Sequence, residues 1–238
     1  MLDEQCPSCG VLFRKLLAAR AGLPAHGVIA VAPDREDSTR LGVLNWLTGL
    51  LEPPTEGREV HAVAGAMLWL LAAWYTWRLI QFDISDPASF PLPFLYGAMV
   101  PFHEFGHILF SPFGEFIHVA GGSLMQFLTP LGFGTYFVHW RRDNLAGWLM
   151  LSWEGMQWVG LAPYCYDAKN PVMILLTGRS GDTGAHDYID MLGDLGLLSH
   201  AHMVAALMKY FGILLMLAAL AWGGLLHLRT WRVRTGGT

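Results

Sequence analysis

Apolar residues in this chain of 238 residues are gathered into long stretches that short polar segments separate. Five such stretches cover about residues 61–82, 91–110, 116–140, 145–166 and 203–228. A helix needs about 20 apolar residues to cross the roughly 30 Å of hydrocarbon in a bilayer, so each stretch is long enough for one crossing. The pattern therefore predicts an all-α membrane protein with four to five apolar crossings.

The third stretch is interrupted by glycine and proline. Its interrupting residues are Gly121, Gly122, Pro130, Gly132 and Gly134. Irregular backbone at membrane depth is tolerated only where protein or a wet cavity surrounds it. Two arrangements stay open: residues 116–140 form a kinked full crossing, or they form a re-entrant segment that enters and returns on the same side.

The distribution of Lys and Arg bears on this choice, because cytoplasmic loops of membrane proteins carry an excess of both. If residues 116–140 re-enter, the N-terminal region, the Arg141–Arg142 loop and the basic tail all share one side, which leaves mainly Lys169 and Arg179 opposite. A full crossing would instead divide the basic residues between the two sides. We therefore favour the re-entrant segment, with a cytoplasmic N-terminus.

Composition supports a membrane protein. The chain is 53% hydrophobic and only 14% charged, whereas soluble domains are usually about 25% charged. A net charge of −4 without long basic blocks excludes nucleic acid as an expected partner. The first apolar stretch begins only after about sixty residues and has no small-residue cleavage pattern behind it, so no cleavable signal is expected. The protein should stay anchored in a lipid bilayer.

Three regions follow from this pattern: a soluble N-terminal region at 1–59, an integral membrane domain at 60–230 and a basic tail at 231–238. The N-terminal region carries Cys6 and Cys9 as CxxC, which resembles one knuckle of a zinc ribbon without the second knuckle. A redox pair, half of a zinc site shared by two chains and plain exposed thiols all stay open. Three cysteines are too few for a disulfide framework.

The second stretch contains HEFGH at residues 103–107, which matches HExxH. Positions i and i+4 share one helix face, so His103 and His107 can bind one metal ion with Glu104 beside it. Zinc held in this way lowers the pKa of its bound water to about 7, and the glutamate accepts the proton. Ionisable residues at membrane depth cost about 3 kcal/mol each on insertion scales, which favours a metal site over coincidence. Pro101 predicts a kink or a restart of the helix just before the motif.

Catalytic zinc commonly takes three protein ligands, so a third is needed. The candidates are Asp167, at the end of the fourth stretch, and the pair His186 and Asp187, which follows a Gly-, Ser- and Thr-rich loop at 177–185. Asp187 is preferred because His186 beside it adds a second possible donor, although Asp187 could also cap a helix and Asp167 could end one in solvent. Gln126 is a candidate for binding the substrate backbone or stabilising an oxyanion.

Other polar residues near or within the apolar stretches are candidates too. Glu154 and Gln157 lie in the fourth stretch, where polar side chains are functional candidates by default. Glu115 and His118 can reach the motif only if the chain turns back at Gly114.

HEFGH in a membrane helix, followed by a glycine-rich segment and a distal aspartate, resembles the site-2 protease family of intramembrane zinc metallopeptidases. The chain is most similar to a bacterial branch of that family, and the likeness covers about residues 101–198. Its further motifs are PFGEF at 112–116, GGSxxQ at 121–126, LxPL at 128–131, APYxxDA at 162–168 and AHDY at 185–188. The well-studied members carry Leu-Asp-Gly in a later transmembrane helix, and this chain has no Leu-Asp-Gly.

The resemblance implies that His103, His107 and a distal aspartate bind Zn²⁺ and that Glu104 is catalytic. It also implies a hydrolase of the bacterial inner membrane, a metalloprotease that cleaves peptide bonds of membrane-anchored proteins. The alternative is a non-catalytic metal-binding membrane scaffold with a peptidase-like fold. The glutamate of HExxH argues against this alternative, because a pure metal carrier does not need it.

Overall fold

The computed structural model describes residues 45–46, 48–52, 58–174 and 186–235. The chain divides into two units, Met1–Asn45 and Trp46–Thr238, and the elements belong to the second unit. Its helices are α3 (Arg58–Gln81), α4 (Pro93–Gly97), α5 (Val100–Phe110), α6 (Glu115–Tyr136), α7 (Asn144–Asp167), α8 (Asp187–Asp194) and α9 (Ala201–Thr235), with short turns at η1 (Pro87–Ser89), η2 (Ser111–Phe113), η3 (Phe137–Arg141) and η4 (Leu198–His200). No strand occurs among the described residues, so the all-α prediction is confirmed. Cys6 and Cys9 lie outside them.

Two helical segments in the described part of the chain are long and apolar enough to cross a membrane. They are Val63–Gln81, in α3, and Leu198–Arg232, which includes η4 and most of α9. Both match stretches that the sequence predicted as crossings. Large apolar side chains such as Leu70, Trp77 and Leu214 are exposed on these helices, as expected for surfaces that face lipid rather than water.

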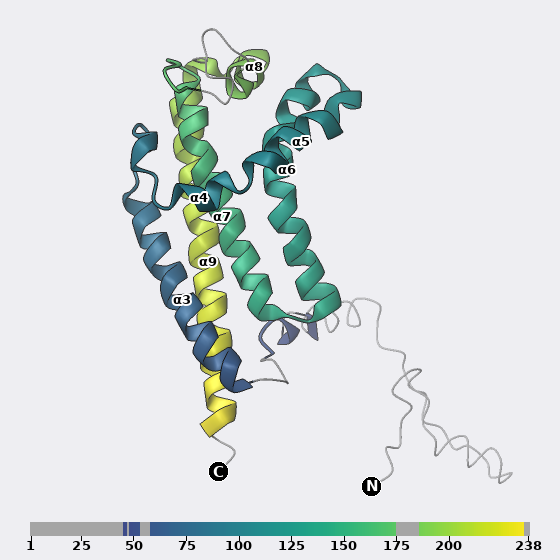
Figure 1. Ribbon diagram of the computed structural model, residues 1–238, viewed down its shortest axis with the longest axis vertical. Coiled ribbons are helices and arrows are strands. Elements are labelled where there is room, and N and C mark those ends of the chain that lie inside the picture. The colour runs from purple at the N-terminus through teal and green to yellow at the C-terminus, as the bar shows by residue number, and fades with distance from the viewer. Residues whose placement is uncertain (1–44, 47, 53–57, 175–185, 236–238) are drawn as a thin grey trace, which may run out of the picture. The chain divides into compact units, whose positions relative to one another are not determined.

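The helix α9 pairs antiparallel with both α3 and α7 (Figure 1). On the α3 side, Trp69 Nε1 donates a hydrogen bond of 2.7 Å to the Leu220 carbonyl. On the α7 side, Gly155 faces Gly212, and a Cβ on either glycine would lie within 2.5 Å of the other's carbonyl oxygen. The missing side chains let the two backbones come into contact, which fixes α7 against α9.

The helix α6 runs antiparallel to α7 (Figure 1). It packs against both α7 and α5, the helix that carries HExxH. It packs on α7 through Phe127 and Trp158, whose rings stack with centroids 4.1 Å apart. It packs on α5 where Gly106 meets Gly121, since a Cβ on Gly106 would collide with the Gly121 carbonyl. Between α5 and α6 the chain reverses through η2 and Gly114, which has a φ of 96°.

The predicted crossing at 91–110 is wrong, because two short helices replace it. Pro93 occupies the start of α4, and Pro101 lies in the first turn of α5. Proline lacks the N–H that continues a helix, so both prolines begin new helices, and the restart predicted at Pro101 is confirmed. The 11 residues of α5 span only about 16 Å, roughly half of the hydrocarbon thickness.

The re-entrant, irregular backbone predicted for residues 116–140 is also wrong. Residues Glu115–Tyr136 form one helix of 22 residues with Pro130 inside it, and a π-helical turn, η3, follows. A continuous helix cannot enter and return on the same side. Two of the glycines predicted to interrupt the backbone instead allow close approach, since Gly121 contacts the backbone of α5 and Gly122 faces the HExxH histidines.

Three segments, two of which carry arginines, nevertheless meet at one end of the helices (Figure 1). Asn144 Nδ2, at the start of α7, donates to the carbonyls of Gly49 and Glu52 at 2.9 and 3.2 Å. Trp222 Nε1, in α9, donates to the Leu50 carbonyl at 2.7 Å. We call this the basic end; it comprises residues 49–52, the turn with Arg141 and Arg142, and the last turns of α9 with Arg229 and Arg232.

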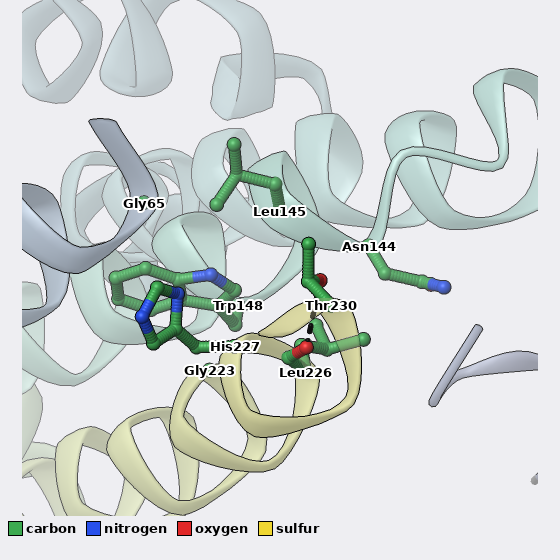
Figure 2. A pocket seen from close by; sticks show the side chains of 8 residues that line it. All are labelled: Gly65, Asn144, Leu145, Trp148, Gly223, Leu226, His227 and Thr230. Atoms are coloured by element: carbon green, nitrogen blue, oxygen red, sulfur yellow. Dashed lines mark hydrogen bonds between the residues drawn. The ribbon is translucent and has the colours of Figure 1, made fainter. Parts of the chain in front are cut away.

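A small cleft of about 30 Å³ lies at the basic end between α3, α7 and α9. Figure 2 shows its lining, which is Gly65, Asn144, Leu145, Trp148, Gly223, Leu226, His227 and Thr230. Thr230 donates its hydroxyl hydrogen to the Leu226 carbonyl of its own helix at 2.9 Å, so this polar group is satisfied locally. The cleft has the volume of about one water molecule.

Candidate metal centre

Two histidines and one aspartate meet beside α6. His103 and His107 lie one turn apart on α5, and Asp187 is the first residue of α8. Asp187 Oδ2 lies 2.8 Å from His103 Nε2 and 3.4 Å from His107 Nε2. The three potential ligand atoms all lie within 4.8 Å of one another, and no other such group of three occurs among the described residues. Two imidazoles and a carboxylate form a donor set suited to zinc.

The backbone of α6 leaves space for an ion in this cluster. A Cβ on Gly122 would lie 2.5 Å from His103 Nε2 and 2.6 Å from His107 Nε2. Any side chain at this position would therefore occupy the region that the two histidine nitrogens face. The contact of Gly106 with Gly121 holds α5 at this short distance from α6. The residues present therefore fit a zinc ion in donor chemistry, and Gly122 places no side chain against the two histidine nitrogens.

Each histidine uses its other ring nitrogen to contact α6. His107 Nδ1 donates to the His118 carbonyl at 3.0 Å, and His118 Nδ1 donates to the His107 carbonyl at 2.8 Å. His103 Nδ1 lies 2.8 Å from Gln126 Oε1. A hydrogen bond of this kind on Nδ1 orients the ring and directs Nε2 toward the ion in most metal-binding histidines.

Asp187 is held in an ionised state. Its backbone N–H donates to the Tyr164 hydroxyl oxygen at 3.0 Å, which ties the start of α8 to α7. Burial raises the pKa of the Asp187 carboxyl, but its contacts with His103 and His107 outweigh burial and lower this pKa to about 2. The carboxyl group is therefore a carboxylate at neutral pH, the form that binds metal ions.

The structure does not bring Asp167 or His186 into the cluster with His103 and His107. Asp167 Oδ1 accepts hydrogen bonds from the backbone N–H groups of Val172 and Met173 at 2.9 and 3.0 Å. The fully buried His186 ring stacks on Tyr164, and its Nε2 lies 3.4 Å from Asp167 Oδ2. Asp167 and His186 therefore contact each other rather than the two histidines of α5.

A cavity of about 600 Å³ opens beside the cluster, which is within the usual size range of ligand pockets. His103, Glu104, His107 and Asp187 all line it. Its other walls are largely apolar, from Pro87, Phe90, Pro93, Tyr96, Val100, Val119, Gly160, Pro163, Tyr164, Met173 and Ile174. A substrate in this cavity would thus meet the histidines and Glu104 together.

Of the remaining candidates, Glu115 and His118 line the cavity because the chain turns back at Gly114, the condition that the sequence analysis set. Gln126 also lines it, and its Nε2 donates to Gln157 Oε1 at 3.2 Å. Glu154 instead accepts from Trp158 Nε1 at 2.9 Å and does not line the cavity.

Sequence reasoning missed Tyr164, which contacts both Asp187 and His186. A signal was present, because Tyr164 belongs to the APYxxDA segment that contributed to the family resemblance. The importance of Gly122 was also missed, although GGSxxQ contains it. Both residues contact the candidate site from other helices, and a motif alone does not reveal such contacts.

No protein-family model, no curated protein and no solved structure matches this chain. The likeness to site-2 proteases therefore rests on the sequence motifs. Any function must be argued from the geometry around His103, His107, Asp187 and Glu104.

Proposed function

We propose that the protein is an integral-membrane zinc metallopeptidase that hydrolyses peptide bonds of membrane-anchored proteins, as the resemblance to site-2 proteases implies. One observation carries the proposal: His103, His107 and Asp187 meet at a cavity that Glu104 also lines. These residues come from α5 and from α8, 84 positions apart for His103 and Asp187, so their meeting is a property of the fold rather than of a local motif.

His103 Nε2, His107 Nε2 and Asp187 Oδ2 would hold the zinc. When bound, zinc supplies a Lewis acid that polarises a carbonyl and lowers the pKa of water to about 7. Glu104 is placed as the general base, because it follows His103 directly on α5 and its side chain is exposed at the cavity. It accepts the proton of the water that adds to the scissile carbonyl carbon. It then returns this proton to the nitrogen as the C–N bond breaks.

The cavity favours an apolar, unwound segment as substrate. Its volume of about 600 Å³ and its aromatic and proline-rich walls suit a few extended residues from a membrane anchor. A peptide bond within a transmembrane helix is shielded by the helix's own hydrogen bonds, so the anchor must unwind locally before cleavage. The short helices α4 and α5, which do not span the bilayer, leave room beside α6 for such a segment.

We further propose that α3, α6, α7 and α9 each cross the membrane once. At a rise of about 1.5 Å per residue, the 22 residues of α6 and the 24 of α7 span about 33 and 36 Å. Four crossings place residues 49–52 and the end of α9 on the same side, in agreement with the contacts at the basic end. The excess of Arg there makes it the cytoplasmic end, as expected for an inner-membrane protein.

The experiment compares the membrane proteomes of cells that carry the wild type, Glu104→Gln or Glu115→Gln. Glu115 is a matched control because it lines the same cavity from α6. Removing a general base typically slows a reaction by about 10²–10⁴-fold. We expect uncut membrane proteins to accumulate with Glu104→Gln but not with Glu115→Gln. If Glu104→Gln retains zinc and no protein accumulates, the protein is instead a metal-binding scaffold.

A further inference from the structure

Two glutamines are completely buried between α6 and α7. Gln126 is 1% exposed and Gln157 is 0% exposed. A buried amide without hydrogen bonds costs about 1–3 kcal/mol in proteins, so such side chains are expected to have partners. His103 Nδ1 lies 2.8 Å from Gln126 Oε1, Gln126 Nε2 donates to Gln157 Oε1 at 3.2 Å, and the Gln126 side chain also hydrogen-bonds with Tyr96. His103, Gln126 and Gln157 form a hydrogen-bonded chain, which we call the amide relay.

We propose that the amide relay sets the tautomer of His103 and that Gln126 and Gln157 are positioning residues of the metal centre. Because Gln126 directs its N–H toward Gln157, its carbonyl oxygen faces His103. An amide oxygen only accepts, so His103 Nδ1 must carry the hydrogen. Nε2 is then the nitrogen that faces Asp187 and His107, where an ion would bind. This inference rests on the proposed function only for the identity of the metal.

The second histidine shows why a relay is needed at the first. His107 Nδ1 faces the backbone carbonyl of His118, which can only accept, so its tautomer is fixed by α6 itself. His103 faces a side-chain amide, which could present either its oxygen or its nitrogen. A reversed Gln126 would present its N–H groups to Nδ1 and place the hydrogen of His103 on Nε2. In the structure, Gln126 donates to Gln157 and presents its oxygen to His103.

In the part of the chain that the structure describes, the Gln157 side chain makes one hydrogen bond, and this bond is with Gln126. Its Nε2 has no hydrogen-bond partner among the described residues, so its only such contact is the one that it accepts from Gln126. A buried polar side chain with one contact on another helix is a poor device for stability alone. We propose that this contact helps to present the Gln126 carbonyl oxygen to His103. The relay therefore assigns Gln126 to the orientation of His103, in place of the oxyanion role expected from sequence.

The test measures zinc affinity of the purified full chain by competition with a chelator of known affinity. Losing a hydrogen-bond partner of a metal-binding histidine typically weakens metal affinity by about 10–100-fold, which we expect for Gln126→Met. We expect Gln157→Met to weaken affinity less than tenfold, because Gln126 remains and only its orientation is released. Gln126→Glu should restore the affinity, since a carboxylate also accepts from Nδ1–H and forms a carboxylate, histidine and zinc triad.

A matched control and a second measurement separate positioning from folding. Thr129→Val removes another buried polar group of α6, one whose hydroxyl bonds only to Met125 of the same helix, and should leave zinc affinity unchanged. Nitrogen NMR of the zinc-loaded protein should show hydrogen on Nδ1 of His103 in the wild type and in Gln126→Glu. Wild-type affinity in Gln126→Met, or hydrogen on Nε2 in the wild type, would overturn the relay. Zinc affinity requires no substrate, so the relay can fail while the peptidase proposal stands, and the reverse.

Discussion

The two ends of the helical unit bury polar side chains in different ways. At the basic end, Asn144 and Trp222 donate to backbone carbonyls of residues 49–52, around a cleft of only about 30 Å³. At the opposite end, which we call the cavity end, His103 contacts Asp187 and Gln126 through side chains, around a cavity of about 600 Å³. The contacts at the basic end attach residues 49–52 to α7 and α9. The side chains at the cavity end instead line an open space, which makes them the candidate site.

Glycines make the same distinction within one helix. In α6, a Cβ on Gly122 would collide with the nitrogens of His103 and His107, whereas a Cβ on Gly132 has no neighbour within 4 Å. Both glycines lie in an apolar helix and both weaken it by about 1 kcal/mol relative to alanine. Only Gly122 has a structural reason that involves the candidate site. Of these two glycines, only Gly122 lies where a side chain would collide with the candidate site.

The largest expected effect concerns the side of the membrane that each end faces. In a background without Cys6, Cys9 and Cys165, Lys169→Cys lies at the cavity end and Arg141→Cys at the basic end, and both positions are exposed. We expect an impermeant thiol reagent added to intact cells to label Lys169→Cys and not Arg141→Cys. Labelling of both from outside, or the reverse pattern, would contradict the proposed orientation. Labelling of Arg141→Cys after lysis controls for reactivity.

The second prediction compares zinc affinity after loss of Asp187, a proposed ligand, with zinc affinity after loss of Asp167, which we do not expect to bind the ion. Asp187→Ala removes one of three proposed ligands, so we expect zinc affinity to fall by more than about 100-fold, beyond the range for outer contacts. Asp167→Ala disturbs His186 and the turn at Val172, and should weaken zinc by about 10-fold. The affinities come from chelator competition. A greater loss in Asp167→Ala would make Asp167 the ligand.

Alanine substitutions in α6 provide a matched pair. Gly122→Ala adds a methyl group that must displace the rings of His103 and His107, so we expect about 10–100-fold weaker zinc binding. Gly132→Ala meets no atom within 4 Å and should leave zinc binding unchanged while stabilising the helix slightly. Titration of both variants with zinc under the same conditions tests the pair. Equal affinities would remove the space argument for the ion site.

The smallest effect lies at the basic end. Asn144→Ala removes the hydrogen bonds to Gly49 and Glu52, and each such bond contributes about 1 kcal/mol to stability. We expect the free energy of unfolding to fall by about 2 kcal/mol without any change in zinc affinity. Denaturant unfolding of wild type and variant, with a zinc titration of each, measures both quantities. A change in zinc affinity would show that the two ends are coupled.

The sequence predicted the features that depend on residue spacing within one segment, such as long apolar helices and the two histidines of HExxH. The helices α3, α7 and α9 follow continuous apolar stretches, and HExxH fixes the relative positions of His103 and His107 by helix geometry alone. The preference for Asp187 agrees with its place in the cluster, but its stated reason does not. His186 does not assist as a donor, because its ring is buried against Tyr164 and faces Asp167.

Features that depend on contacts between two helices could not be predicted from the sequence. The apolar stretch at 91–110 gave no measure of helix continuity, because hydropathy reports burial and not hydrogen bonding along the chain. Pro93 and Pro101 carried the only signal for its division into α4 and α5. The glycines of α6 suggested irregular backbone when considered alone. Gly121 and Gly122 instead contact α5, and the sequence alone does not show this contact.

The metal content of the purified protein tests the central claim most directly. Elemental analysis would be made on wild type, His103→Ala, His107→Ala and Glu104→Gln purified in parallel. Our account predicts about one zinc per chain in the wild type and in Glu104→Gln, since Glu104 transfers a proton rather than binding the ion. It predicts loss of zinc in both histidine variants, because each removes one of only three protein ligands. Full zinc occupancy in His103→Ala and His107→Ala would contradict the metal centre and, with it, the proposed peptidase.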